Sequence, residues 1–215
     1  MELSNLKIVS VITARGGSKE IPKKNILPIK GNPLIWYTIN ASQKSKVHET
    51  WVSTDCEEIA SVALNAGAKV IERPKELADD IIMPDAALVH FAENIDFDLL
   101  VFIQPTSPLL CHYHINKGID MMAEYDSVFS AYKEHWLPRW DKNANPIDWD
   151  INNRPRRQDM SEQYVENGAL YITTKQNLLE SKLRYSGNIG IVEMSLQKSF
   201  QLDSYDDLRV LENLL

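Results

Sequence analysis

The sequence predicts an α/β fold with a Rossmann-like, mainly parallel central sheet and helices on both of its faces. Strand-like apolar runs alternate with segments of helical periodicity through the first half of the chain. This alternation is typical of a parallel sheet whose crossovers are helices. The run at 97–108 is almost continuously apolar, as in a strand buried on both faces. A chain of 215 residues with 44% hydrophobic content can bury one sizeable core, so we expect a single domain over 1–215.

The predicted elements follow from the apolar spacing and from their terminating residues. The strands are expected at 6–13, 49–55, 68–73, 97–108, 167–173 and 187–194. The helices are expected at 33–45, 56–67, 84–94 and 204–215. The first of these helices opens with proline and the second is closed by Gly67. Ser204 and Asp207 fit a capping box at the start of the last helix.

A protruding arm is expected at about 136–158. This segment is rich in Pro, Asn, Asp and Trp and has little periodicity, so it suits neither a packed helix nor a central strand. Its tryptophans, Trp136, Trp140 and Trp149, could cover the domain's own core or contact a second subunit, and both alternatives are open.

Charge and cysteine content exclude several classes of protein. The net charge of -7 argues against a nucleic-acid or membrane surface, because such partners need broad basic patches. The N-terminal apolar run is short for a signal peptide, and we expect a cytoplasmic protein. Cys56 and Cys111 suit neither a metal spacing nor a disulfide framework. His112 and His114 would point to different faces of a helix, so we expect surface histidines and not a metal pair.

A glycine-bearing loop with four cationic side chains follows the first strand, in the stretch VITARGGSKEIPKKN at 11–25. Open α/β sheets bind ligands beyond the carboxyl ends of their strands. Gly16 and Gly17 would let backbone N–H groups approach a ligand, and the cations would neutralise phosphate oxygens. The loop therefore predicts a triphosphate site, although it matches neither a Walker loop nor the dinucleotide fingerprint. A solvated basic turn is the alternative for the loop taken alone.

The same loop resembles the signature of the CMP-sialic acid synthetases, or acylneuraminate cytidylyltransferases, A-R-x-x-S-K-x-[IL]-P-x-K-N. The matching residues are Ala14, Arg15, Ser18, Lys19, Ile21, Pro22, Lys24 and Asn25. Further matches follow in order as VSTD (52–55), ERPKELADD (72–80), QPTSPL (104–109), RRQ (156–158), ENGALYI (166–172) and LDSYDDL (202–208). They span nearly the whole chain. The related octulosonate cytidylyltransferases normally replace the lysine-asparagine of the first loop, so the nonulosonate branch fits better.

This resemblance implies that CMP is transferred from CTP to the anomeric hydroxyl of a nonulosonic (sialic-type) acid, with release of pyrophosphate. It also implies a homodimer that uses Mg²⁺ or Mn²⁺. The implied nucleotide-binding residues are Ala14, Arg15, Ser18, Lys19, Lys24, Asn25 and Arg73. The implied catalytic residues are Arg15, Lys24 and Asp203, and Asp203 would also bind the metal. Fixed cations suit this chemistry because attack at the α-phosphate builds negative charge on its oxygens.

The implied sugar-binding residues are Gln104, Arg157, Gln158, Asn167 and Tyr171. An arginine suits the sugar's carboxylate because its fork binds both oxygens. Arg154, Arg156 and Arg157 all lie in the matching segment, and the choice among them is open.

Departures from the family pattern affect the metal site and the substrate contacts. Members usually carry two aspartates separated by one residue, where this chain has Gln201 and Asp203. Asp203 would then bind the metal without a second carboxylate. Asp206 and Asp207 at a helix start are interpreted as capping or dipole-complementing residues.

Two further departures leave the specificity open. Pro84 stands where some members carry a serine near the cytidine, and Val165 stands where a basic residue is common. A sugar nucleotidyltransferase with another base or sugar preference is therefore one alternative, and Gln201 suggests a catalytically silent nucleotide-sugar binding protein as another. The sugar acid of the main hypothesis is N-acetylneuraminate or a legionaminate- or pseudaminate-like relative.

Overall fold

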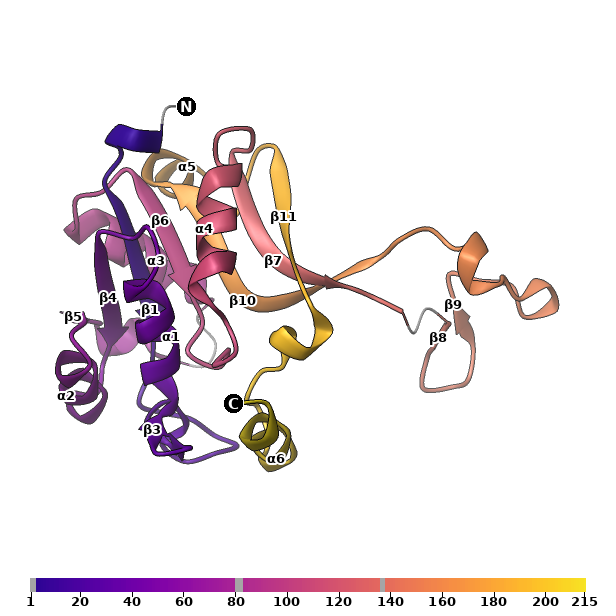
Figure 1. Cartoon of the computed structure of the whole chain (residues 1–215), viewed down its shortest axis with the longest axis horizontal. Coiled ribbons are helices and arrows are strands. Elements are labelled where there is room, and N and C mark those ends of the chain that lie inside the picture. The colour runs from indigo at the N-terminus through magenta and orange to yellow at the C-terminus, as the bar shows by residue number, and fades with distance from the viewer. Residues whose placement is uncertain (1–2, 80–82, 136–137) are drawn as a thin grey trace.

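The computed structural model describes residues 3–79, 83–135 and 138–215. Within them, a seven-stranded sheet with the order β11-β7-β10-β6-β1-β4-β5 forms the centre of the molecule (Figure 1). Its strands are β1 (Ile8–Thr13), β4 (Glu49–Thr54), β5 (Lys69–Glu72), β6 (Leu99–Ile103), β7 (Ser127–Lys133), β10 (Tyr164–Thr174) and β11 (Ile189–Met194). The helices are α1 (Leu34–Gln43), α2 (Glu57–Asn65), α3 (Pro84–Asn94), α4 (His112–Met121), α5 (Lys175–Ser181) and α6 (Tyr205–Leu214).

The sheet is mainly parallel, as the sequence predicts. β10 is antiparallel to both of its neighbours, β6 and β7, and the other neighbouring strands are parallel. The reversal at β10 follows from chain order, because β7 and β10 are connected through the arm as the two sides of one long hairpin. The chain extends the sheet on one side of β1 with β4 and β5 and then crosses to its other side with β6. Ligand sites of open α/β sheets lie at such switch points.

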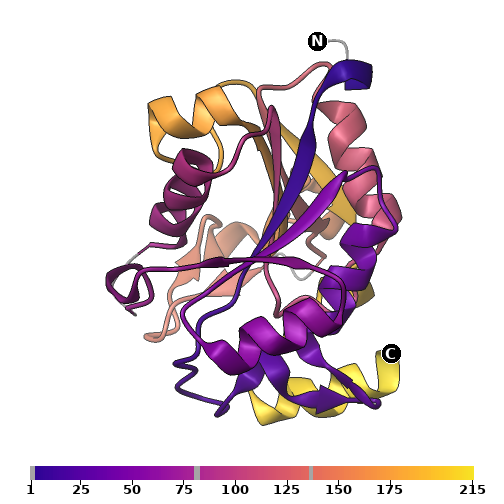
Figure 2. The ribbon, with the colours of Figure 1, turned by 90° about the vertical axis from the view of Figure 1, so that its left-hand side faces the viewer.

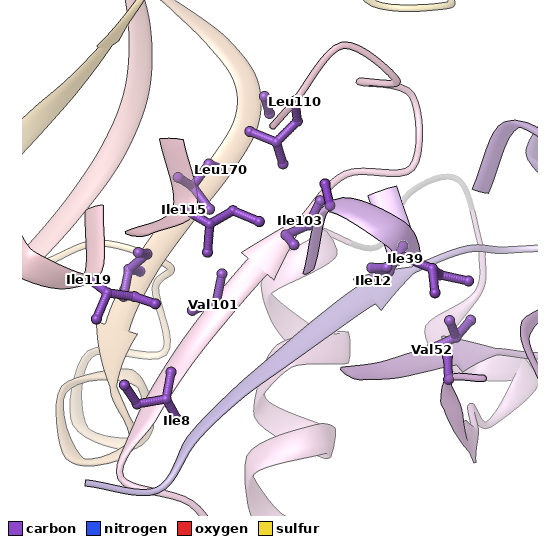
Figure 3. Packing of buried hydrophobic residues seen from close by; sticks show 14 of the residues in the cluster. Ile8, Ile12, Ile39, Val52, Val101, Ile103, Leu110, Ile115, Ile119 and Leu170 are labelled. Atoms are coloured by element: carbon purple, nitrogen blue, oxygen red, sulfur yellow. The ribbon is translucent and has the colours of Figure 1, made fainter. Parts of the chain in front are cut away.

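Helices cover both faces of the sheet, as Figure 2 shows in the view turned by 90°. On one face α1 and α4 pack on the strands, and Figure 3 labels Ile8, Ile12, Ile39, Val52, Val101, Ile103, Leu110, Ile115, Ile119 and Leu170 there. On the other face, Val9 and Val11 pack with Leu88 and Phe91 of α3 and with Leu178 of α5. The alternate residues of β1 thus enter opposite cores. Each such buried side chain stabilises the fold by about 1.5–3 kcal/mol.

The predicted strands and helices are all present, with ends shifted by a few residues. Among the strands of the central sheet and the helices that cover it, β7, α4 and α5 are not among the predicted elements. α5 has seven residues, of which Leu178 is buried, so its apolar periodicity is too short to recognise. α4 contains Gly118, which disfavours a helix in isolation. Packing explains this glycine, because a Cβ there would lie 2.8 Å from Ile172 Cδ1 on the sheet.

The arm between β7 and β10 projects away from the sheet, as Figure 1 shows. It contains the strand pair β8 (Arg139–Trp140) and β9 (Pro146–Ile147), followed by the short helices η4 (Ile151–Asn153) and η5 (Arg157–Asp159). At its base, the Glu134 N–H donates a hydrogen bond to the Gln163 carbonyl at 2.8 Å.

The described tryptophans of the arm pack on each other and not on the core of the domain. The rings of Trp140 and Trp149 meet edge to face with centroids 4.8 Å apart. The Trp149 indole N–H donates to the Arg139 carbonyl at 2.9 Å. These two tryptophans therefore do not cover the domain's own core, whereas Trp136 lies outside the described residues.

A third, smaller core joins the two ends of the chain. Ile21 and Ile29 of the first loop region pack with Leu202 and with Leu211 of α6. The predicted capping box at the start of α6 is confirmed, because the Ser204 hydroxyl accepts from the Asp207 N–H and the Asp207 carboxylate accepts from the Ser204 N–H. This core positions the segment before α6 beside the glycine-bearing loop.

One of the two predicted surface histidines is buried. His112 is exposed, but His114 is only 5% exposed, and its Nδ1 accepts a hydrogen bond from the Cys111 N–H at 3.2 Å. Burial, with help from Lys198, Lys117 and His112, lowers the pKa of His114 to about 4. Its role is to cap α4 from inside the fold, which a spacing argument does not reveal.

No helix in the described ranges is both long and apolar enough to cross a membrane.

Candidate active site

A pocket of about 520 Å³ opens at the carboxyl ends of the central strands. It brings together residues from the two ends and the middle of the chain. The predicted site residues that line it are Arg15, Ser18, Lys19, Lys24, Asn25, Arg73, Gln104 and Asp203. The pocket therefore lies where the sheet topology places a ligand.

The glycine-bearing loop is held at both of its ends. Ala14 is fully buried and its N–H donates to a carbonyl of β4, so it extends the sheet by one residue and presents no side chain to the pocket. The Gly16 N–H donates to the Asp55 carboxylate at 2.9 Å. The side-chain amide of the buried Asn25 donates to the Arg15 carbonyl at 2.9 Å. These bonds fix the backbone from which Arg15 enters the pocket.

Lys24 meets the C-terminal segment at the edge of the pocket. Its ammonium lies 3.0 Å from Asp203 Oδ1, and its side chain is 17% exposed. The Leu202 N–H donates to the Thr106 carbonyl at 2.8 Å, which fixes the position of the next residue, Asp203. The structure thus joins a basic and an acidic group from opposite ends of the chain.

Arg73 is a buried cation in the wall of the pocket. It follows β5, and its guanidinium donates to the Ser53 carbonyl at 2.6 Å and to the Ser53 hydroxyl at 3.1 Å. Burial lowers the pKa of Arg73 to about 10; nearby Arg15 acts in the same direction, and Asp55 opposes it. The guanidinium remains protonated at neutral pH. A bound anion would be stabilised by Arg15 and Arg73 because both charges are close to it and one is desolvated.

The side chains of Gln104 and Gln201 both lie close to the backbone of Gly168. This glycine has φ +68°, and a Cβ there would lie 2.6 Å from Gln201 Nε2 and 3.1 Å from Gln104 Oε1. The position therefore requires glycine for its conformation and for the close approach. The Thr106 hydroxyl lies 3.5 Å from Gln201 Oε1, at the limit of a hydrogen bond.

The polar groups of Asn167 and Tyr171 contact the chain itself. The Asn167 amide donates to the Ser199 hydroxyl at 2.8 Å and accepts from the Ser130 hydroxyl at 2.6 Å. The Tyr171 hydroxyl donates to the Glu166 carboxylate, and burial together with this bond raises the pKa of Tyr171. Neither residue is among those that line the pocket, although Asn167 lines an adjoining hollow of about 380 Å³ that also contains Asp203. Their roles toward a sugar remain predictions.

Arg157 and Gln158 lie on the arm and are exposed. Neighbouring Arg156 donates to the Asp159 carboxylate at 2.7 Å. Within one chain, Arg157 and Gln158 are not among the residues that line the pocket.

The oxygen donors available to a metal are few. Asp203 is 63% exposed at its side chain, and Gln201 lines the adjoining hollow with it. Among the described residues, no group of three or more His, Cys, Asp or Glu side chains could hold a metal ion. One carboxylate suits Mg²⁺ where a nucleotide supplies phosphate ligands, because this ion is commonly bound by one or two carboxylates together with substrate phosphates.

Several lining residues are not among the predicted site residues. The pocket also contains Glu20, Asp79, Pro84, Phe102 and Thr106. Glu20 and Asp79 lie within the matching stretches, so the motifs could have identified them as site residues. Phe102 is buried in a strand, and its sequence context is that of an ordinary core residue.

Sequence comparison finds relatives that are named N-acylneuraminate cytidylyltransferases. The chain is 38% identical over 216 residues to the N-acylneuraminate cytidylyltransferase A of Danio rerio, covering 95% of this chain and 50% of the relative. It is 30% identical over 213 residues to the N-acylneuraminate cytidylyltransferase of Streptococcus agalactiae, covering 94% of this chain and 52% of the relative. The chain thus spans about half the length of the curated relatives it matches.

Structural comparison finds the same architecture in solved structures of a synthetase and a synthase. A structure of CMP:2-keto-3-deoxy-manno-octonic acid synthetase complexed with CTP superposes with a TM-score of 0.75 at 19% identity, covering 97% of this chain and 98% of that one. The 4-diphosphocytidyl-2C-methyl-D-erythritol synthase of Anaerococcus prevotii superposes with a TM-score of 0.71 at 12% identity, covering 96% and 94%. At these sequence identities, the two superpositions show a shared fold and no more.

The family model described as cytidylyltransferase matches residues 9–212, which include the loop, the pocket and the arm. The chain therefore belongs to the cytidylyltransferase family.

Proposed function

We propose that this chain transfers CMP from CTP to the anomeric hydroxyl of a nonulosonic (sialic-type) acid and releases pyrophosphate. The observation that supports this most is the convergence of Arg15, Lys19, Lys24 and Arg73 in one pocket at the carboxyl edge of the sheet. The names of the curated relatives favour this activity over another base or sugar preference.

The pocket residues suit phosphoryl chemistry. Attack of the sugar hydroxyl on the α-phosphate increases the negative charge on the phosphate oxygens and on the departing pyrophosphate. Arg15, Lys19 and Lys24 would stabilise this charge from fixed positions, and the Ser18 hydroxyl and the loop N–H groups would bind the phosphates. Asn25 and Arg73 lie deeper, where the cytidine would be placed.

Asp203 would hold Mg²⁺ (or Mn²⁺) together with the phosphates of the nucleotide. When bound, the metal would neutralise phosphate charge. Asp203 also accepts a hydrogen bond from Lys24 at 3.0 Å, so this carboxylate would be held where it could accept the proton of the attacking hydroxyl. Gln104 would contact the sugar acid beside it.

A homodimer in the cytoplasm completes the proposal. The arm would pack across a two-fold interface and bring one of Arg154, Arg156 and Arg157, together with Gln158, to the sugar site of the other subunit. The support for this is that the arm projects from the domain with its arginines exposed (Figure 1). A single chain therefore has a pocket rich in nucleotide-binding groups and an arm whose basic residues lie elsewhere.

Pyrophosphate release tests the activity. The purified protein is incubated with CTP, Mg²⁺ and a panel of N-acetylneuraminate, legionaminate-type, pseudaminate-type and octulosonate sugars, with ATP, GTP and UTP in parallel. We expect steady release with CTP and at least one nonulosonate. CTP should also raise the melting temperature more than ATP or GTP, because a ligand at 100 times its Kd stabilises the native state by about 2.7 kcal/mol.

The alternatives give different results in the same assay. Equal thermal shifts with CTP, ATP and GTP would contradict the cytidine assignment. A large CTP shift without turnover of any sugar would identify a silent binding protein.

A further inference from the structure

A largely buried ion pair lies beside the pocket, and neither of its residues is among those that line it. Asp85 is in the first turn of α3, next to Pro84, which lines the pocket. Arg184 lies between α5 and β11. Their side chains are 9% and 13% exposed.

The pair is joined by three hydrogen bonds. The Arg184 N–H donates to Asp85 Oδ1 at 2.7 Å, its Nε to the same oxygen at 3.2 Å, and its Nη2 to Oδ2 at 2.5 Å. Burial acts to raise the pKa of Asp85, but the bonds and charge of Arg184 outweigh it and lower that pKa. Both groups are thus charged at neutral pH, and the fork of Arg184 fixes the orientation of the carboxylate.

The guanidinium also lies over two stacked rings. Its central carbon is 5.6 Å from the ring centre of Phe102 and 5.0 Å from that of Tyr171. The two rings are stacked with centroids 5.4 Å apart and an interplanar angle of 20°. Phe102 is a lining residue of the pocket and belongs to β6, which ends one residue before Gln104. Arg184 therefore contacts both the helix that carries Pro84 and the strand that carries Phe102.

We infer that the Asp85–Arg184 pair positions the wall of the nucleotide pocket, by fixing the start of α3 and Pro84 against Phe102 and the end of β6. Arg184 is a positioning residue in this account because its contacts are to Asp85 and to the rings, and it is absent from the pocket lining. The inference rests on the proposed function for the identity of the ligand, CTP, and on the contacts above for the pair itself.

A purely structural pair would behave differently from a positioning pair. Removing one partner leaves a buried charge unpaired and is strongly destabilising, whereas replacing both can restore stability. If the pair only stabilises the fold, CTP binding should return when stability returns. If it sets the pocket wall, CTP binding should stay weak in a protein whose stability has recovered.

The test compares Arg184→Met, Asp85→Asn and the double variant with the wild-type protein. We expect both single variants to melt at lower temperature and the double variant to recover most of the loss. In the double variant the KM for CTP should remain raised by about fivefold or more, while kcat changes by less than about threefold. The reason is that the variant loses contacts made equally to bound CTP and to the transition state, and keeps those made only in the transition state. A double variant with wild-type stability and wild-type KM would overturn the inference.

Hydrogen exchange of the ligand-free protein gives a readout that does not depend on activity. Peptides covering 84–90 and 99–104 should exchange faster in the double variant than in the wild type. Ile119→Ala is the control, because Ile119 is buried in α4 on the opposite face of the sheet. It should lower the melting temperature without changing the KM for CTP or the exchange of those two peptides.

One further variant and the hydrogen-exchange measurement resolve two complications. If the double variant does not fold, Arg184→Lys decides, because it keeps the charge but loses the planar fork and the ring contact; a raised KM supports the inference and an unchanged KM overturns it. If the wild type neither binds CTP nor releases pyrophosphate, the proposed function fails, and the hydrogen exchange of the two peptides still decides whether the pair holds the wall.

Discussion

Lys23 and Lys24 are neighbours in the chain, yet their ammonium groups contact carboxylates on different elements. Lys23 pairs with Glu58 of α2 and is 65% exposed at its side chain, whereas Lys24 pairs with Asp203 and lines the pocket. Lys23 has φ 55°, in the left-handed region, at the turn that separates the two side chains. Of these two adjacent lysines, Lys23 is therefore a surface residue and Lys24 belongs to the pocket.

Replacing Lys24 by alanine should reduce kcat/KM for CTP by about tenfold or more, because a charge-assisted contact is worth about 1.5–3 kcal/mol. Lys23→Ala is the matched control and should change kcat/KM by less than about twofold, since exposed ion pairs contribute little. Steady-state pyrophosphate release measures both. Similar losses in the two variants would show that the loop acts through its net charge alone.

The proposed metal site can be tested at Gln201 and Asp203. Asp203→Asn should reduce turnover by about a hundredfold or more with the fold retained, because the carboxylate that would bind the metal and accept the proton of the attacking hydroxyl is lost. Gln201→Asp should lower the Mg²⁺ concentration that gives half-maximal rate, because a second carboxylate increases affinity for a hard cation. The measurement is a magnesium titration of the rate, with circular dichroism for the fold.

Asp206→Asn is the control for this pair, because its side chain is 91% exposed and lies 3.6 Å from Arg209. It should leave the magnesium dependence unchanged. If Asp203→Asn stays active and Gln201→Asp has no effect, the metal is held by other groups.

At the scale of elements, α6 positions the C-terminal edge of the site. Its capping box holds the turn that contains Asp203, because the Asp207 carboxylate accepts from the N–H groups of both Asp203 and Ser204. The apolar face of the helix packs through Leu211 on the first loop region. The helix cap therefore helps to fix the position of Asp203, which pairs with Lys24.

Ser204→Ala should lower the free energy of unfolding by about 1 kcal/mol, the usual effect of removing an N-cap hydroxyl. Urea denaturation measures it. Asp206→Asn, in the same turn but without a capping bond in the structure, should have a smaller effect.

The contribution of Asp207 should depend on pH. Burial acts to raise its pKa, but hydrogen bonds from Ser204 and Asp203 outweigh this and lower it. A carboxyl group whose pKa is lowered by folding stabilises the protein fully above its unfolded pKa, about 3.9, and loses this contribution as pH falls through the folded value. Asp207→Asn should therefore be less stable than the wild type at pH 7, and the difference should shrink below about pH 4. A constant difference in urea unfolding at pH 7 and pH 3 would contradict the cap assignment.

At the scale of the whole molecule, the arm is a separate extension of the β7–β10 hairpin. Its described tryptophans pack on each other, and its base is closed by the hydrogen bond from Glu134 to Gln163. The pocket and the sheet do not depend on these arm contacts. The arm can therefore be removed at its base without exposing the core.

Replacing residues 138–158 by a short Gly/Ser linker should leave the domain folded, abolish dimerisation and reduce activity to background. Sedimentation velocity and pyrophosphate release measure the two losses. An active monomer would contradict the role proposed for the arm.

Subunit mixing locates the contribution of the arm. A full-length variant with Arg157→Ala and Gln158→Ala and a second full-length variant with Lys24→Ala should each have low activity. After mixing in equal amounts, about a quarter of wild-type activity should return, because half of the dimers then contain one intact pocket served by one intact arm. No recovery despite exchange of subunits would show that arm and pocket act within one chain.

Local sequence patterns predict most of the alternating strands and helices, the glycine-bearing loop after β1 and the capping box of α6. These features depend on local spacing: apolar residues repeat with the period of a strand or helix, and the Ser204 and Asp207 groups are three residues apart. The motif matches also placed Arg15, Lys24, Arg73 and Gln104 in one site before any geometry was known.

The contacts between groups that are distant in the chain follow from the tertiary structure and not from any local pattern. The Lys24–Asp203 and Asp85–Arg184 pairs, and the burial of His114, join segments whose separation in the chain carries no periodic signal. They form because the apolar clusters around Leu202 and Phe102 bring the segments together, and charged groups then pair where the packing leaves them. Burial is set by what covers a residue from elsewhere in the chain, and a local pattern contains no information about that covering element.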